Sequence, residues 1–174
     1  MTTKDRLRRA AAIVAVFGLL ATGCGEEAAS EPVRFGTRGE DIKPLDVPMP
    51  KRILGLRVER ENVRKTIREV EDTYVDALSV YSLRKAKLLQ ATLQVSHMGP
   101  SADITPGFRR TIVNALGGQA PREVRVGDDT VWLATGANQL LISWFRDERF
   151  FVLSIRQDFL RPRELLRTIL ETEL

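Results

Sequence analysis

The chain has 174 residues, 43% of them hydrophobic, which suits a single domain with its own core. Its 27 Lys and Arg against 23 Asp and Glu give a formal charge of +4, and the sequence pI is 9.6. A single Cys excludes an internal disulfide framework and an all-Cys zinc site, and a single His excludes the metal motifs that use two histidines.

The first 24 residues carry the most specific signal in the chain. Residues 4–9 include four basic side chains, and an apolar run from Ala10 to Ala21 follows them. As a helix, a run of about a dozen residues spans only about 18 Å, short of the ~30 Å hydrocarbon core of a bilayer. The pattern therefore predicts a signal peptide rather than a transmembrane helix.

The only Cys directly follows this apolar run. The segment Leu20-Ala21-Thr22-Gly23-Cys24 resembles the lipobox of bacterial lipoprotein precursors. The resemblance implies removal of residues 1–23 and attachment of diacylglycerol to the sulfur of Cys24, with acylation of the new amino terminus. Two or more acyl chains anchor a protein stably, so we expect a cell-membrane lipoprotein with its domain on the extracytoplasmic side. The alternative is an ordinary secretory peptide with an incidental Cys.

Residues 24–50 have the composition of a flexible tether. The stretch after Cys24 holds half of the eight prolines, together with six acidic and three basic residues. Low hydrophobicity with frequent Pro and Gly predicts too little buried surface to offset the entropy of ordering. As a coil, such a segment has a root-mean-square span of about 28 Å. We expect it to hold the domain off the membrane.

Residues 51–174 are expected to form one α+β domain. Residues 53–58 predict a short opening strand, after which Asn62 can cap a helix. Alternating apolar and polar residues at 89–96 predict a strand. Residues 80–83 either pair with this strand as a hairpin, or the first helix continues through Tyr81. The apolar stripe of that helix has spacings of three and four and consists of Val63, Ile67, Val70, Tyr74, Leu78 and, if the helix extends so far, Tyr81.

The C-terminal half shows a helix, four strands and a last helix. The turn residues between the strands predict an antiparallel meander of residues 122–126, 130–135, 139–146 and 149–156. Pro162 is expected to begin the final helix. We therefore expect an antiparallel sheet with about three helices packed on one face. The first of these helices is expected to end at Gly117-Gly118, and its inward residues are Phe108, Ile112, Ala115 and Leu116. The inward residues of the last helix are Leu165, Leu166, Ile169 and Leu170.

Six of the eleven aromatic residues lie between positions 132 and 159. In the strand at 139–146, Phe145 faces one way and Trp144 the other. Either both faces of this sheet are covered by core, or one face is an exposed patch that suits a protein partner or a lipidic ligand. The candidate binding surface consists of Trp132, Trp144, Phe145, Phe150 and Phe151.

No catalytic or metal site is expected. His97 ends a predicted strand, and a general base there is conceivable. However, the domain has no Cys, no second His and no G-x-S-x-G nucleophile turn, so a half-exposed strand-end histidine is the preferred interpretation. Asp128-Asp129 offers too few oxygens for Ca²⁺, and the glycines form no phosphate loop, so no metal or cofactor is predicted.

The basic clusters do not predict nucleic-acid binding. Four of the basic residues lie in the predicted signal peptide, and an exported domain does not meet cytoplasmic nucleic acid. We therefore expect a non-enzymatic, lipid-anchored module that binds or scaffolds an envelope protein or lipid. The alternatives are a carrier or sensor of a hydrophobic ligand and, third, a hydrolase. The clusters interpreted as solvated faces are Arg84/Lys85/Lys87, Arg109-Arg110 and Arg161/Arg163/Arg167.

Overall fold

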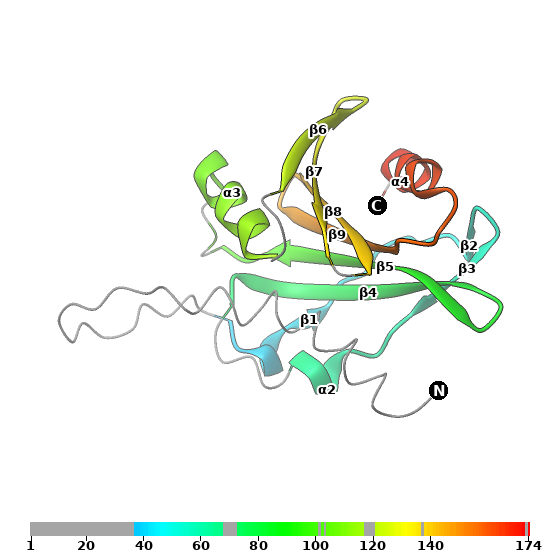
Figure 1. The fold of residues 1–174 in the computed structure, drawn as a ribbon. Helices are drawn as coiled ribbons and strands as arrows, with labels where there is room; N and C mark the ends of the chain where they lie inside the picture. Colours follow the sequence, from blue (N-terminus) through cyan, green and yellow to red (C-terminus); the bar gives the residue numbers. More distant parts are fainter. Residues whose placement is uncertain are drawn as a thin grey trace.

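A computed structural model describes residues 37–67, 73–100, 102, 104–116, 121–136, 138–172 and 174. Within this part, the helices are η1 (Gly39–Asp41, a 3-10 turn), α2 (Arg64–Ile67), α3 (Pro106–Ala115) and α4 (Pro162–Glu171). The strands are β1 (Lys43–Pro44), β2 (Arg52–Ile53), β3 (Leu56–Arg60), β4 (Val75–Lys85), β5 (Leu88–Met98), β6 (Arg122–Val126), β7 (Asp129–Thr135), β8 (Gln139–Arg146) and β9 (Arg149–Arg156). These strands form one nine-stranded, almost entirely antiparallel sheet, which confirms the α+β class (Figure 1).

The sheet order brings distant parts of the chain together. The strands follow the order β2-β3-β4-β5-β9-β8-β7-β6, and β1 pairs in parallel with β4. The meander β6–β9 was predicted from its turn residues, and its strands begin and end at nearly the expected positions. Its last strand, β9, pairs with β5 and places His97 directly opposite Arg149.

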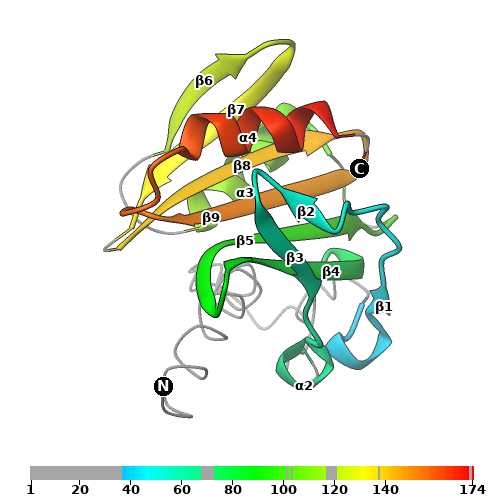
Figure 2. The same cartoon turned by 90° about the vertical axis from the view of Figure 1, so that its right-hand side faces the viewer.

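The helices cover both faces of the sheet, not one face as predicted. Figure 2 shows α4 in front of the C-terminal strands and α3 behind them. Trp144 packs with α4, whereas its neighbour Phe145 packs with α3, because successive residues of a strand point to opposite faces. We call the two cores the α4-side cluster and the α3-side cluster. Central members of the first are Leu83, Leu93, Val95, Ile142, Trp144, Phe151, Leu153, Leu165 and Ile169, and of the second Leu78, Val80, Met98, Ile112, Val113, Phe145, Phe150 and Val152.

The helix predicted from Asn62 is much shorter than expected. α2 is a single turn, and by Val75 the chain has entered β4, so the expected third long helix is wrong. Leu78 and Tyr81, which completed the apparent helical stripe, are strand residues. The spacing was misleading because β4 is buried on both faces: Leu78 lies in the α3-side cluster and Tyr81 in the α4-side cluster. An apolar run without alternation fits a buried strand as well as a helix. The β4–β5 hairpin is confirmed.

α4 begins where the sequence predicts, whereas α3 begins at Pro106, two residues before Phe108, the first residue of its predicted inward face. Thr105 caps α3, since its hydroxyl accepts a hydrogen bond from the backbone N–H of Phe108 at 3.2 Å. Pro162 occupies the first turn of α4. Val70 of the predicted first helix and Gly117-Gly118, the predicted end of α3, lie outside the described residues.

The predicted opening strand is instead a hairpin. β2 and β3 pair across a two-residue turn at Leu54-Gly55, and both turn residues have positive φ, 48° and 77°. Such a turn reverses the chain within two residues. A single strand over residues 53–58 was therefore wrong because the reversal falls in the middle of an apolar stretch.

The predicted tether is too long at its C-terminal end. Residues 37–50 belong to the domain: Ile42 and Val47 are buried, and β1 pairs with β4. The Ser79 hydroxyl donates a hydrogen bond to the carbonyl of Leu45 at 2.5 Å, and the Tyr81 hydroxyl donates to the carbonyl of Val47 at 3.3 Å. The burial of Ile42 and Val47 in the core thus orders the Pro-rich segment of residues 37–50. Residues 24–36 of the predicted tether lie outside the described residues.

The β6–β7 turn depends on a glycine. Gly127 has a φ of 63°, in the left-handed region. This conformation costs a residue with a Cβ about 1–2 kcal/mol of conformational free energy. We expect Gly127→Ala to lower the free energy of unfolding by about that amount. Apart from chain neighbours, no heavy atom lies within 4 Å of the added Cβ, so no steric clash contributes.

Gly107, in the first turn of α3, provides a matched control. There Ala is expected to be neutral or to stabilise by up to about 1 kcal/mol, because Ala favours helix. Urea denaturation of both variants measures the two effects. An equal loss in the two variants would contradict the assigned turn conformation.

Candidate functional site

The predicted aromatic surface is mostly core. Trp144, Phe145, Phe150 and Phe151 are all buried, with exposed fractions of 1–8%. Trp144 stacks on Phe151 in the α4-side cluster, and Phe145 stacks on Phe150 in the α3-side cluster, with ring centroids 5.0 and 4.5 Å apart. These four residues therefore form no exposed surface, because a helix covers each face of their strands.

Trp132 is the member of the set that keeps part of its surface accessible. It packs edge-on against Phe145, with centroids 6.2 Å apart. The guanidinium of Arg109 lies over the same Phe145 ring at 5.3 Å, a cation–π contact. Arg109 therefore covers an aromatic ring of the core, which corrects its interpretation as part of a solvated face.

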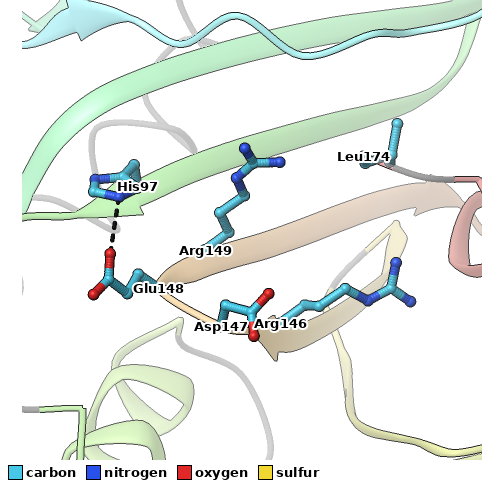
Figure 3. A pocket seen from close by; sticks show the side chains of 6 residues that line it. All are labelled: His97, Arg146, Asp147, Glu148, Arg149 and Leu174. Atoms are coloured by element: carbon cyan, nitrogen blue, oxygen red, sulfur yellow. Dashed lines mark ion pairs between the residues drawn. The ribbon is translucent and has the colours of Figure 1, made fainter.

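The only histidine of the chain, His97, lies between two carboxylates, of which Figure 3 shows that of Glu148. Its Nδ1 donates a hydrogen bond to Asp76 Oδ1 at 2.7 Å, and its Nε2 lies 3.3 Å from Glu148 Oε2. About a third of the His97 side chain is exposed, 32%, so the predicted half-exposed strand-end histidine is confirmed. Its acidic partners were not foreseen in the sequence.

Three separate elements build this cluster. Asp76 lies where the β4–β5 register shifts, between Val75 and Ala77, and such a bulge redirects a side chain. His97 is near the end of β5, in register with Ala77. Glu148 belongs to the two-residue turn between β8 and β9, and its carbonyl accepts a hydrogen bond from the backbone of Met98 at 2.9 Å. The cluster forms only because β9 pairs with β5.

A hollow of about 450 Å³ adjoins the cluster, lined by His97, Arg146, Asp147, Glu148, Arg149 and Leu174 (Figure 3). The guanidinium of Arg146 is already held, since it donates to Asp129 at 3.0 Å and to the carbonyl of Leu170 at 2.9 Å. The guanidinium of Arg149 has no hydrogen-bond or ion-pair partner among the described residues. The hollow therefore contains one cationic group that is available to a ligand.

The arrangement does not resemble a metal centre. The two carboxylates contact opposite nitrogens of the imidazole, so they cannot converge with the ring on one ion. In the described part of the chain, no three His, Cys, Asp or Glu side chains are grouped to hold a metal.

The His97–Asp76 hydrogen bond is the kind of contact that orients a catalytic base. However, the other ring nitrogen, Nε2, already lies 3.3 Å from the Glu148 carboxylate, so this nitrogen is not open to a substrate. The described residues that line the hollow include no Ser, Thr or Cys that could act as a nucleophile.

The remaining predicted sites are ordinary surface features. Asp129 of the Asp128-Asp129 pair is engaged by Arg146. Arg84 forms ion pairs with Glu59 and Glu61, at 3.4 and 3.3 Å, as expected of a solvated face.

At the end of β9, a hydrogen bond joins the side chains of Arg156 and Asp158. It lowers the pKa of the Asp158 carboxyl and raises the pKa of the Arg156 guanidinium. Both groups are exposed, so this contact is a surface feature that stands apart from the hollow.

Comparison with protein-family models, curated protein sequences and solved structures finds no match to this chain. Cys24, the predicted lipidation site, lies outside the described residues. Within the described residues, the helices are too short or too polar to span a bilayer. The function must therefore be argued from the residues themselves.

Proposed function

We propose that this chain is a lipid-anchored protein of the cell envelope, held to the membrane through Cys24, whose domain is a non-enzymatic binding module on the extracytoplasmic side. The lipobox-like segment and the preceding signal-peptide pattern support the anchor. Acyl chains on one cysteine suffice for stable attachment.

The observation that carries the binding role is the hollow beside His97. Arg149 places a guanidinium there without a partner among the described residues, while Asp76 and Glu148 occupy both nitrogens of His97. A free guanidinium binds carboxylates in a two-point geometry. The partner that fits best is an envelope protein presenting an acidic side chain to Arg149.

The alternative functions have less support. A carrier of a hydrophobic ligand was suggested by the aromatic residues of the meander, but four of the five are packed in the core. A hydrolase would use His97 as a base, and the Glu148 carboxylate beside Nε2 opposes that role.

The anchor is tested by Cys24→Ala in a bacterium that processes lipoproteins. The wild-type chain should incorporate an alkyne-labelled fatty acid and partition into the detergent phase of Triton X-114. The variant should lose the label and leave that phase. Unchanged partitioning and unchanged gel mobility of the variant would contradict the proposed anchor.

The binding site is tested by photocrosslinking in the same cells. Benzoylphenylalanine at Leu174, which lines the hollow, should yield a discrete protein adduct, whereas the same residue at Leu160, 94% exposed and outside the hollow, should not. Arg149→Glu should reduce the adduct by about tenfold, since a lost charge-assisted contact is worth on the order of 1.4 kcal/mol. Equal adducts at both positions, or no effect of Arg149→Glu, would contradict the assignment.

A further inference from the structure

The sheet ends in a strand whose outer edge has no neighbour among the described elements. β6 is the last strand in the sheet order and pairs only with β7. Figure 2 shows the β6–β7 hairpin projecting from the rim of the molecule, away from β4 and β5. An open edge offers a row of unpaired backbone N–H and C=O groups to another strand.

The side chains of β6 alternate between two faces. Val124 and Val126 are half-buried against the α4-side cluster, whereas Glu123 and Arg125 are exposed on the other face. Neither Glu123 nor Arg125 has an ion-pair partner in the part of the chain that the structure describes. This face of the edge therefore presents one negative and one positive charge, two residues apart, while the exposed Arg122 lies on the face of Val124 and Val126.

The β6–β7 turn decides which backbone groups point outward. Val126 and Asp129 flank the two-residue turn and are opposite each other, so they form a hydrogen-bonded pair. Hydrogen-bonded and non-hydrogen-bonded pairs alternate along an antiparallel ladder. The backbone N–H and C=O groups of Val124 and Arg122 therefore also form hydrogen bonds with β7. Those of Glu123 and Arg125 point outward, away from β7.

These two facts restrict how two copies of β6 could pair antiparallel. The outward groups must meet, which allows Glu123 opposite Glu123, Arg125 opposite Arg125, or Glu123 opposite Arg125. The first two registers place like charges directly across from each other, which is unfavourable. The third makes two Glu–Arg pairs and brings Val124 opposite its own copy on the two-fold axis.

We propose that β6 is a self-association edge, through which two copies of this chain join their sheets with Val124 facing Val124. Charged residues often protect an edge from pairing. Here their signs are complementary under the two-fold rotation that relates like subunits. The inference goes beyond the proposed binding function and does not depend on it. A membrane anchor would strengthen the pairing by raising the effective concentration of the copies.

Cysteine crosslinking tests both the contact and its register. In the proposed register the two Val124 residues form a non-hydrogen-bonded pair, with Cα atoms about 4.5 Å apart, a distance that a disulfide spans. In the full chain carrying Cys24→Ser, Val124→Cys should form a disulfide-linked dimer under mild oxidation. Glu123→Cys and Arg125→Cys should not, because each would lie about 8 Å or more from its own copy.

Charge exchange provides a second test in the Val124→Cys background. Glu123→Arg alone and Arg125→Glu alone should each reduce the crosslink by about tenfold, because each creates two like-charge pairs. Mixing the two single variants, tagged to differ in size, should restore a crosslink between them. Glu123→Arg combined with Arg125→Glu should restore the dimer of one chain.

The outcomes are distinct. A crosslink at Val124 that follows the charge pattern supports the proposal. Stronger crosslinking at Glu123→Cys or Arg125→Cys, no crosslink at any of the three positions in chains with an unchanged circular dichroism spectrum, or a Val124 crosslink indifferent to charge exchange would overturn it. A wild-type chain that incorporates no fatty-acid label, together with an intact Val124→Cys crosslink, would refute the anchor and leave this edge contact supported.

Discussion

Replacing Trp144 by Ala is expected to lower the free energy of unfolding by about 3–5 kcal/mol, the largest loss for any single substitution considered. Trp144 is 1% exposed and stacks on Phe151, so its removal leaves a cavity between β8 and α4. Such a loss is a large share of the 5–15 kcal/mol typical of a domain. Urea denaturation followed by circular dichroism measures it.

Trp132→Ala is the matched control for this experiment. Trp132 is only half-buried and makes a T-shaped contact with Phe145, so we expect Trp132→Ala to lower the free energy of unfolding by about 1–2 kcal/mol. If the aromatic residues formed an exposed binding surface, both substitutions would be nearly neutral for folding. A loss at Trp144 no larger than that at Trp132 would therefore contradict the assignment of Trp144 to the core.

Leu165→Ala should cost about 2–5 kcal/mol, because the side chain is fully buried between α4 and the sheet. α4 also covers the face that Trp144 occupies. If Leu165→Ala weakens the packing of α4 on the sheet, Trp144 should become more exposed and its fluorescence should shift to longer wavelength. Denaturation and emission spectra of the same samples check the two effects together.

Leu160 offers the same substitution five residues earlier. It is 94% exposed, and Leu160→Ala should change stability by no more than about 0.5 kcal/mol. Comparable losses at Leu160 and Leu165 would show that α4 does not seal this face of the sheet.

The meander and the last helix were predictable because their signals are local. Gly127 and Asp147 mark tight turns, and the residues between the turns have the right number and type for strands. The apolar residues of α4 repeat with helical spacing directly after Pro162. Neither feature depends on which strands become neighbours.

The candidate site could not be predicted in this way. Asp76 and His97 are 21 residues apart in the chain, and Glu148 reaches them only through the pairing of β9 with β5. The bulge at Asp76 is an irregularity of the β4–β5 pairing that the apolar and polar pattern of the sequence does not indicate. His97 could be singled out by its type, but its partners could not.

The sequence alone predicts the signal peptide, the lipobox-like Cys24 and the turns of the meander, because each depends on residues within a few positions of one another. The tertiary structure decides which apolar faces are covered. Trp144 and Phe145 are adjacent and equally apolar, yet one is buried under α4 and the other under α3. Burial is a property of the elements that meet across the sheet, and the edge left open at β6 follows from the same arrangement.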